Sequence, residues 1–143
     1  MRLTRLGRDD TGSTLILVIF YAALCLAVIL LGTAATSLYL ERKRLFSLAD
    51  GAALAAAQNF TTVTGSADMP RFELTDTAVA DAAARYLAAV RSSDDVVLLR
   101  ADTPDGVAAR IELRTEWQPP LVSAFVSTGV PIEVTSTATV SVE

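Results

Sequence analysis

The hydrophobic pattern of the chain begins with a long stretch that has no polar face. Residues 11–40 contain no charged side chain, and residues 15–31 are apolar or aromatic throughout. A bilayer core about 30 Å thick is crossed by about 20 helical residues. A helix of a soluble domain is disfavoured, because the stretch has no amphipathic face and such helices rarely exceed about 20 residues. The pattern predicts a transmembrane helix.

A cleaved secretory signal is the alternative for the same stretch, because Arg2, Arg5 and Arg8 precede the apolar run. The apolar region of such signals has only about 7–15 residues, and the sequence near residues 33–35 fits a small-residue cleavage site poorly. We therefore expect the segment to be retained as an anchor.

Helical character continues beyond the anchor, because no proline occurs before Pro70 and Gly51 alone would cost only about 1 kcal/mol relative to alanine. The expectation is one helix over residues 14–59. Its second half carries a narrow apolar stripe that would let another element approach closely: Leu45, Leu48, Ala52, Ala55 and Ala56.

A second helix is predicted over residues 76–91, after an irregular connector at residues 61–75. Thr75 is a suitable N-cap, and Asp76 suits the first turn. The apolar positions recur with helical spacing and predict one packed face: Val79, Ala82, Ala83, Tyr86, Leu87 and Val90.

The period then changes from 3.6 to 2, which indicates strands over residues 96–102, 107–117 and 131–143. The turn at residues 103–106 places Pro104 and Gly106 where a type I turn with a following left-handed residue needs them. Residues 121–130 remain unassigned. One face of the second and third strands is expected to be buried: Val107, Ala109, Ile111, Leu113, Thr115, Trp117, Ile132, Val134, Ser136, Ala138, Val140 and Val142.

These elements predict an α+β fold, in which the second helix and the end of the first cover a three-stranded antiparallel sheet. The expected organisation is a basic leader at residues 1–12, a transmembrane helix with an extension at residues 13–60, and a small domain at residues 61–143. The charge count leaves the orientation open, because three basic residues flank each end of the apolar run.

The composition excludes several kinds of chemistry. The chain has no histidine, its one lysine follows no glycine-rich loop, and Cys25 lies inside the apolar run. The aspartate pairs at residues 9–10 and 94–95 suit solvated turns better than catalysis. Residues 41–143 hold nine basic and fourteen acidic residues, which disfavours nucleic-acid binding. No catalytic, cofactor or metal site is predicted.

Two features of the first helix suggest partners. Gly32 and Thr36 have the four-residue spacing of small residues that lets transmembrane helices approach closely, although small residues without a partner are an equal alternative. The cluster Arg42, Lys43 and Arg44 either contacts anionic lipid or marks the membrane edge.

Three stretches are similar to one known family: residues 8–14, the apolar run, and the sequence after it with Tyr39, the basic cluster and the alanine-rich segment around Asp50, Ala52, Ala53 and Leu54. They resemble the start of the TadE/TadG-like proteins of tight-adherence (Flp, type IVb) pilus systems, most closely the short actinobacterial members. The resemblance covers about the first 60 residues.

This resemblance implies a bacterial single-span membrane protein with a cytoplasmic N terminus and an exported pilin-like domain. Its partners would be other pilin-like subunits and the assembly platform, in a homo- or hetero-oligomer. Gly12 and Ser13 resemble a prepilin processing site, but Leu17 stands where pilins carry a glutamate that pairs with a neighbouring subunit. The missing glutamate therefore favours an accessory subunit or assembly factor over the main fibre protein. Neither of these roles includes enzymatic activity.

A stand-alone, membrane-anchored binding module outside the cytoplasm is the alternative function. An anchored hydrolase is disfavoured, because the side chains for acid–base or metal chemistry are missing.

Overall fold

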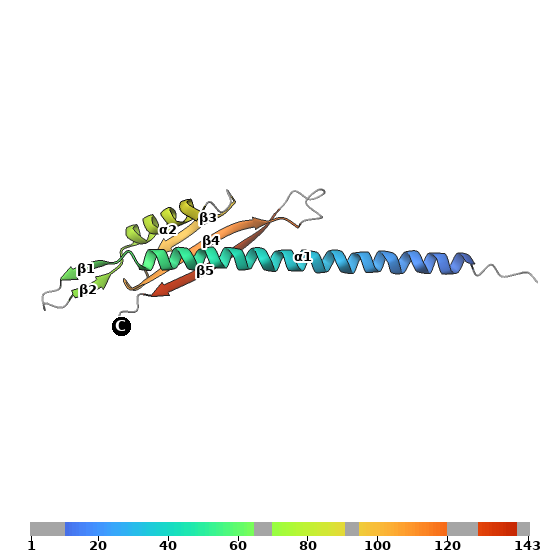
Figure 1. The fold of residues 1–143 in the computed structure, drawn as a ribbon, viewed down its shortest axis with the longest axis horizontal. Helices are drawn as coiled ribbons and strands as arrows, with labels where there is room; N and C mark the ends of the chain where they lie inside the picture. The colour runs from blue at the N-terminus through green and yellow to red at the C-terminus, as the bar shows by residue number, and fades with distance from the viewer. Residues whose placement is uncertain (1–10, 65–69, 91–94, 120–128, 140–143) are drawn as a thin grey trace, which may run out of the picture. The chain divides into compact units, whose positions relative to one another are not determined.

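The computed structural model describes residues 11–64, 70–90, 95–119 and 129–139. The elements in chain order are α1 Thr11–Ala57, β1 Thr61–Thr64, β2 Pro70–Glu73, α2 Asp76–Val90, β3 Val97–Asp102, β4 Ala108–Trp117 and β5 Val130–Thr139 (Figure 1). The predicted α+β class is confirmed, with its long apolar first helix, second helix and three-stranded antiparallel sheet. The chain forms two compact units, divided between Thr36 and Ser37 within α1.

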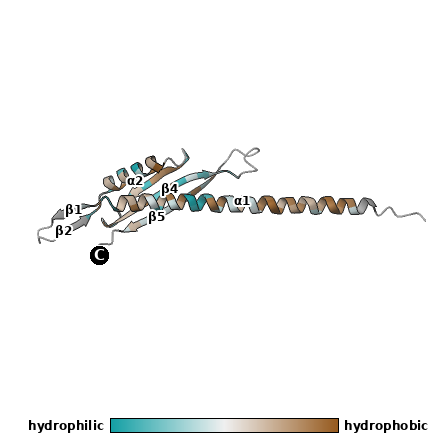
Figure 2. Cartoon of the chain, in the orientation of Figure 1, coloured by the Kyte–Doolittle hydropathy of each residue, from teal (hydrophilic) through white to brown (hydrophobic). Residues whose placement is uncertain are grey.

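The first unit consists of the apolar part of α1. Its side chains from Thr14 to Thr33 are exposed, and this stretch is almost uniformly hydrophobic in Figure 2. By length and composition the helix could span a membrane. The predicted basic leader at residues 1–12 lies almost wholly outside the described residues.

In the second unit, α1 buries one face in the core. Of the five residues in the predicted stripe, Leu45, Ala52 and Ala56 are buried, and Leu48 and Ala55 are half-buried. Ala49, Ala53 and Ala57 are also buried, so the packed face is wider than expected and consists mostly of methyl groups. The helix ends at Ala57, where the side-chain amide of Asn59 donates to the Ala55 carbonyl at 2.8 Å.

Helix α2 begins with the predicted cap: the Ala78 amide donates to Thr75 Oγ1 at 3.3 Å. Val79, Ala82 and Ala83 are buried, and Tyr86 and Leu87 pack partly against the same core. The prediction is wrong for Val90, which is 42 % exposed because it occupies the last position of the helix.

The sheet has the order β3–β4–β5, and both neighbouring pairs are antiparallel. One face joins the core formed with α1 and α2, through Ala109, Ile111, Leu113, Ile132 and Val134. The opposite face of β4 carries Arg110, Glu112 and Arg114, and we call it the outer face of the sheet. A register shift interrupts the β3–β4 pairing between Leu98 and Arg100.

The turn before β4 has the left-handed residue that the sequence predicts, since Gly106 has a φ of 74°. Two neighbouring expectations are wrong. Val107 is 45 % exposed and precedes the strand, whereas Ala108 is buried at 3 % although its position is on the outer face. The alternation of buried and less buried residues starts only at Ala109, because the backbone amides of the two residues before it are hydrogen-bonded to Asp105 of the turn.

Residues 61–75 are not an irregular connector, which corrects the expectation for this segment. β1 and β2 form an antiparallel pair from Thr61 opposite Glu73 to Thr64 opposite Pro70. Threonine and valine favour strands, but each run has only four residues, too few to show a period. Residues 121–128 and 140–143 lie outside the described part, so most of the unassigned segment and Val140 and Val142 are not placed. The last residue of that segment, Val130, begins β5.

Candidate functional site

The association candidates Gly32 and Thr36 lie on one exposed surface of α1. The Thr36 hydroxyl donates to the Gly32 carbonyl at 2.9 Å, and the Thr33 hydroxyl donates to Leu30 at 2.9 Å. A Cβ atom at Gly32 would meet nothing within 4 Å. The hydroxyls are therefore satisfied within the helix, and the surface beside Gly32 is open. Close approach of a second helix there stays a prediction.

The processing candidates Gly12 and Ser13 belong to the first turn of α1, which begins at Thr11. Their cleavage is untested and remains a prediction. The lone cysteine, Cys25, is exposed on the apolar part of the same helix. Within the described residues no cluster of three or more histidine, cysteine, aspartate or glutamate side chains could hold a metal ion.

The structure divides the basic cluster that follows the apolar run. Arg42 and Lys43 are exposed and line a shallow groove of about 220 Å³ together with Tyr39 and Phe46. Arg44 instead lines a different cleft. Successive residues of a helix point about 100° apart, so three adjacent cations cannot share one surface.

The cleft beside Arg44 has a volume of about 390 Å³ and lies where α1 meets the end of β4. The Trp117 indole Nε1 donates to Ser37 Oγ at 3.2 Å, which joins the two elements. Sequence reasoning placed Trp117 only on the buried face of a strand, and no local signal indicates a partner 80 positions away. The cleft is lined by Ser37, Glu41, Arg44, Asp95, Thr115, Glu116, Trp117 and Gln118.

The family-motif positions further along α1 serve mostly to pack the helix onto the domain. Ala52 and Ala53 have no exposed surface. Asp50 Oδ1 accepts a hydrogen bond from Ser136 Oγ of β5 at 3.2 Å, and Ser136 is otherwise a buried hydroxyl on the core face. Leu54, by contrast, is 55 % exposed. Ala52 and Ala53 are thus the motif positions that are closed to other molecules, whereas Tyr39, Arg42, Lys43, Arg44, Asp50 and Leu54 are exposed.

Gly51 lies within this motif and has a specific packing role. A Cβ atom there would overlap the phenol group of Tyr86, well inside contact distance. The missing side chain lets α2 bring Tyr86 against α1. Sequence reasoning treated Gly51 only as a weak helix former, although a glycine amid alanines in a helix is a signal of close approach.

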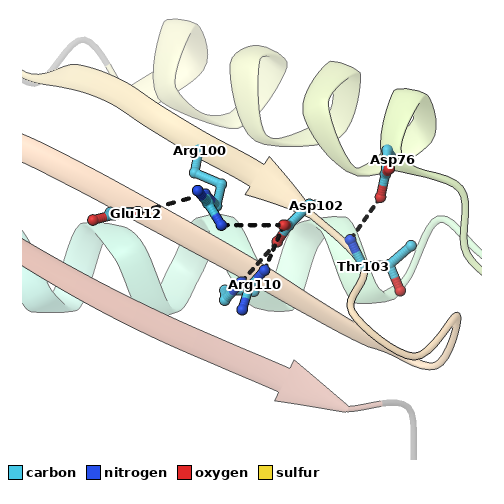
Figure 3. Close-up of polar contacts among 6 residues, drawn as sticks. All are labelled: Asp76, Arg100, Asp102, Thr103, Arg110 and Glu112. Carbon is cyan, nitrogen blue, oxygen red and sulfur yellow. Dashed lines mark hydrogen bonds and ion pairs between the residues drawn. The ribbon is translucent and has the colours of Figure 1, made fainter.

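The outer face of the sheet carries a charged network (Figure 3). Arg110 forms a bidentate salt bridge with Asp102, in which Nε donates to Oδ1 at 2.8 Å and Nη2 donates to Oδ2 at 2.5 Å. Arg100 lies 3.9 Å from both Asp102 and Glu112. At the end of β3, the backbone amide of Thr103 donates to Asp76 Oδ1 of α2 at 2.9 Å.

Two carboxyl groups here have lowered pKa values. The hydrogen bonds from Arg110, helped by the charges of Arg110 and Arg100, hold the pKa of Asp102 below its ordinary value of 3.8. Backbone amides of Ala108 and Val107 lower the pKa of Asp105 in the turn, at hydrogen-bond distances of 2.7 and 3.0 Å. These interactions orient strands and a turn.

These shifts predict how stability depends on pH. Because both pKa values are lower in the folded chain than in the unfolded chain, their contribution is present above about pH 4 and is lost as the pH falls further. We expect the double variant Asp102→Asn/Asp105→Asn to lose less stability than the wild type between neutral pH and pH values below about 4. Urea unfolding of the full chain in neutral detergent at several pH values, followed by Trp117 fluorescence, measures this; identical pH profiles would contradict it.

Comparison with known families gives a match over the first helix. Residues 12–59 match the model of the family described as putative Flp pilus-assembly TadE/G-like. The predicted resemblance is therefore confirmed over residues 12–59. Comparison with curated proteins and with solved structures found no match.

Proposed function

From the TadE/G-like character of residues 12–59, we propose that this protein is a membrane-anchored, pilin-like component of a tight-adherence pilus or a related secretion system, acting without enzymatic activity as a minor pilin or an assembly factor. The observation that carries the proposal is the continuity of α1. This one helix contains the apolar stretch and then supplies a face of the domain core.

The proposal includes a topology. Residues 1–12 are cytoplasmic, residues 13–60 cross the membrane of a bacterial cell and extend beyond it, and residues 61–143 are exported. The basic residues flank the apolar run equally, so the charge count does not determine the orientation. The support for this orientation comes from the family resemblance. An uncharged Leu17 favours an accessory role, because charge pairing with a neighbouring amino terminus is unavailable at that position.

Co-purification tests the proposal. We expect the tagged full chain, cross-linked in native membranes and then solubilised, to bring down pilin-like subunits and inner-membrane platform proteins. N-terminal sequencing of the recovered chain would start at Ser13 if prepilin-type processing occurs and at Met1 if the protein is a simple anchor. A chain recovered free of every pilus component would contradict the proposal.

The alternative, an anchored binding module, is favoured by one observation. The cleft beside Trp117 is open, of about 390 Å³, and lined by an indole ring and by charges of both signs. A small-molecule ligand bound there would change the fluorescence of Trp117, the single tryptophan of the chain. Such a change, together with an absence of pilus partners, would favour the alternative.

The association of α1 with other helices gives a specific prediction. Gly32→Leu fills the open surface beside Thr36, so we expect it to weaken lateral association by about 1 kcal/mol or more. Energy transfer between labelled full-length chains in bilayers measures the effect. Ala23→Leu is the matched control, because a residue nine positions earlier lies on the opposite side of the helix. Equal association of both variants and the wild type would count against a contact at Gly32.

A further inference from the structure

We propose that the groove formed by Tyr39, Arg42, Lys43 and Phe46 binds the phosphate headgroup of an anionic phospholipid. The inference goes beyond the proposed function, because it requires only that α1 spans a bilayer and not that the protein takes part in pilus assembly. It rests on the composition of the groove, on its place along α1 and on the different surroundings of Arg44.

The four residues share one surface of α1. Their spacing of three, four and seven positions brings them together on a helix, and they line a groove of about 220 Å³. Tyr39 and Phe46 are 65 % and 51 % exposed, so two rings stand open to the surroundings. Tyrosine at such a position suits the boundary between acyl chains and headgroups, and phenylalanine suits the apolar side of that boundary.

The two cations of the groove are available to a ligand. In the described part of the chain, neither Arg42 nor Lys43 forms an ion pair within the protein, whereas Arg100, Arg110 and Arg114 each do. A guanidinium group presents parallel N–H donors that match phosphate oxygens, and an ammonium group adds a compact charge. The chemistry of the groove therefore fits a phosphate diester with apolar chains beside it.

The place of the groove along α1 favours a lipid over a soluble phosphate. The uncharged stretch is residues 11–40. Counted from the start of the apolar run at Leu15, the residues up to Thr36 extend over about 33 Å of helix, enough for a hydrocarbon core of about 30 Å. The groove begins at Tyr39, immediately beyond that length. A headgroup layer is about 5–8 Å deep on each side, so the side chains of Arg42 and Lys43 fall within its reach.

Arg44 differs from Arg42 and Lys43 in its surroundings. It is the next residue of the same cluster, but it faces the cleft that also contains Glu41 and Trp117 rather than the groove. A simple attraction of positive charge to the membrane would involve all three cations equally. A headgroup site in the groove involves only Arg42 and Lys43.

Lipid retention by the full chain tests the proposal. The chain is purified in neutral detergent, supplied with phosphatidylglycerol or phosphatidylcholine, and its bound lipid is measured by native mass spectrometry. We expect preferential retention of phosphatidylglycerol, and a loss of about tenfold or more in Arg42→Gln/Lys43→Gln, because each cation near an anionic headgroup strengthens binding about fivefold. The control pair removes the same charge outside the groove, at Arg44, which lines the cleft, and at Arg85, an exposed residue of α2. Arg44→Gln/Arg85→Gln should retain the lipid within about twofold, because neither residue lines the groove.

Several results would overturn the proposal. An equal loss in the control pair would show attraction by net charge alone, and equal retention of both lipids would show no headgroup recognition. Displacement of the lipid by inorganic phosphate would identify a site for free phosphate. A change of oligomeric state in Arg42→Gln/Lys43→Gln with unchanged lipid retention would assign the groove to a second subunit. Unchanged near-ultraviolet dichroism of Trp117 verifies that each variant is folded.

Discussion

Ala53→Leu is expected to lower the free energy of unfolding of the domain by about 1–3 kcal/mol. Ala53 has no exposed surface, and its methyl group belongs to the face of α1 that lies in the core with Ile111 and Leu113. Three additional carbon atoms would push α1 away from its neighbours. Urea unfolding of the full chain in neutral detergent, followed by Trp117 fluorescence, measures the loss.

Ala84→Leu is the matched control for this substitution. It introduces the same side chain at an exposed position of α2, where we expect a change within about 0.5 kcal/mol. A similar loss in both variants would mean that leucine acts through something other than burial. A loss confined to Ala53→Leu would show that the small side chain at this position determines how closely α1 packs against the rest of the core.

We expect the effect of Gly51→Ala on the free energy of unfolding to change sign between the wild type and a Tyr86→Ala background. In the wild type, Gly51→Ala places a methyl group against the phenol of Tyr86, and we expect it to lower the free energy of unfolding by about 1–3 kcal/mol. In a Tyr86→Ala background the obstacle is absent. There Gly51→Ala should raise the free energy of unfolding by up to about 1 kcal/mol, because alanine is the better helix former.

The four chains of this double-mutant cycle are compared by the same urea unfolding. The coupling between the two positions is the difference between the two Gly51→Ala effects. A destabilisation of equal size in both backgrounds would contradict the packing explanation and would indicate a backbone requirement for glycine. Tyr86→Ala alone gives the cost of losing the phenol and serves as the reference for the second background.

The elements with a clear period were predictable from the sequence, because periodicity reports which face of a helix or strand is buried. Ala109 to Thr115 on β4 and Ile132 to Ser136 on β5 alternate as expected. The β1–β2 pair was missed, since four residues per strand give too few repeats for a pattern to show. The predictions that Val90 and Val107 are buried are wrong. Periodicity shows which face of an element is apolar, but not how far along that element a neighbouring element packs against it.

The contacts of the candidate surfaces were less predictable, because they join residues distant in sequence. Asp50 is a motif position, but its bond to Ser136 depends on how β5 lies beside α1. The same holds for Trp117 and Ser37. Helical geometry alone shows that Arg44 cannot share a surface with both Arg42 and Lys43. Only the packed domain shows that Arg44 is the one that faces the cleft.

In the part of the chain that the structure describes, β3 and β5 are the two edge strands of the three-stranded sheet, and irregular features of both bear on whether a further strand can add to it. The edge strand β3 has a register shift between Leu98 and Arg100, and β5 carries Pro131, which has no amide hydrogen, followed by the charged Glu133. Bulges, prolines and charges on an edge hinder the addition of a further strand. Many copies held side by side in one membrane would therefore resist fusing into a continuous sheet, which leaves their helices free to determine how they assemble.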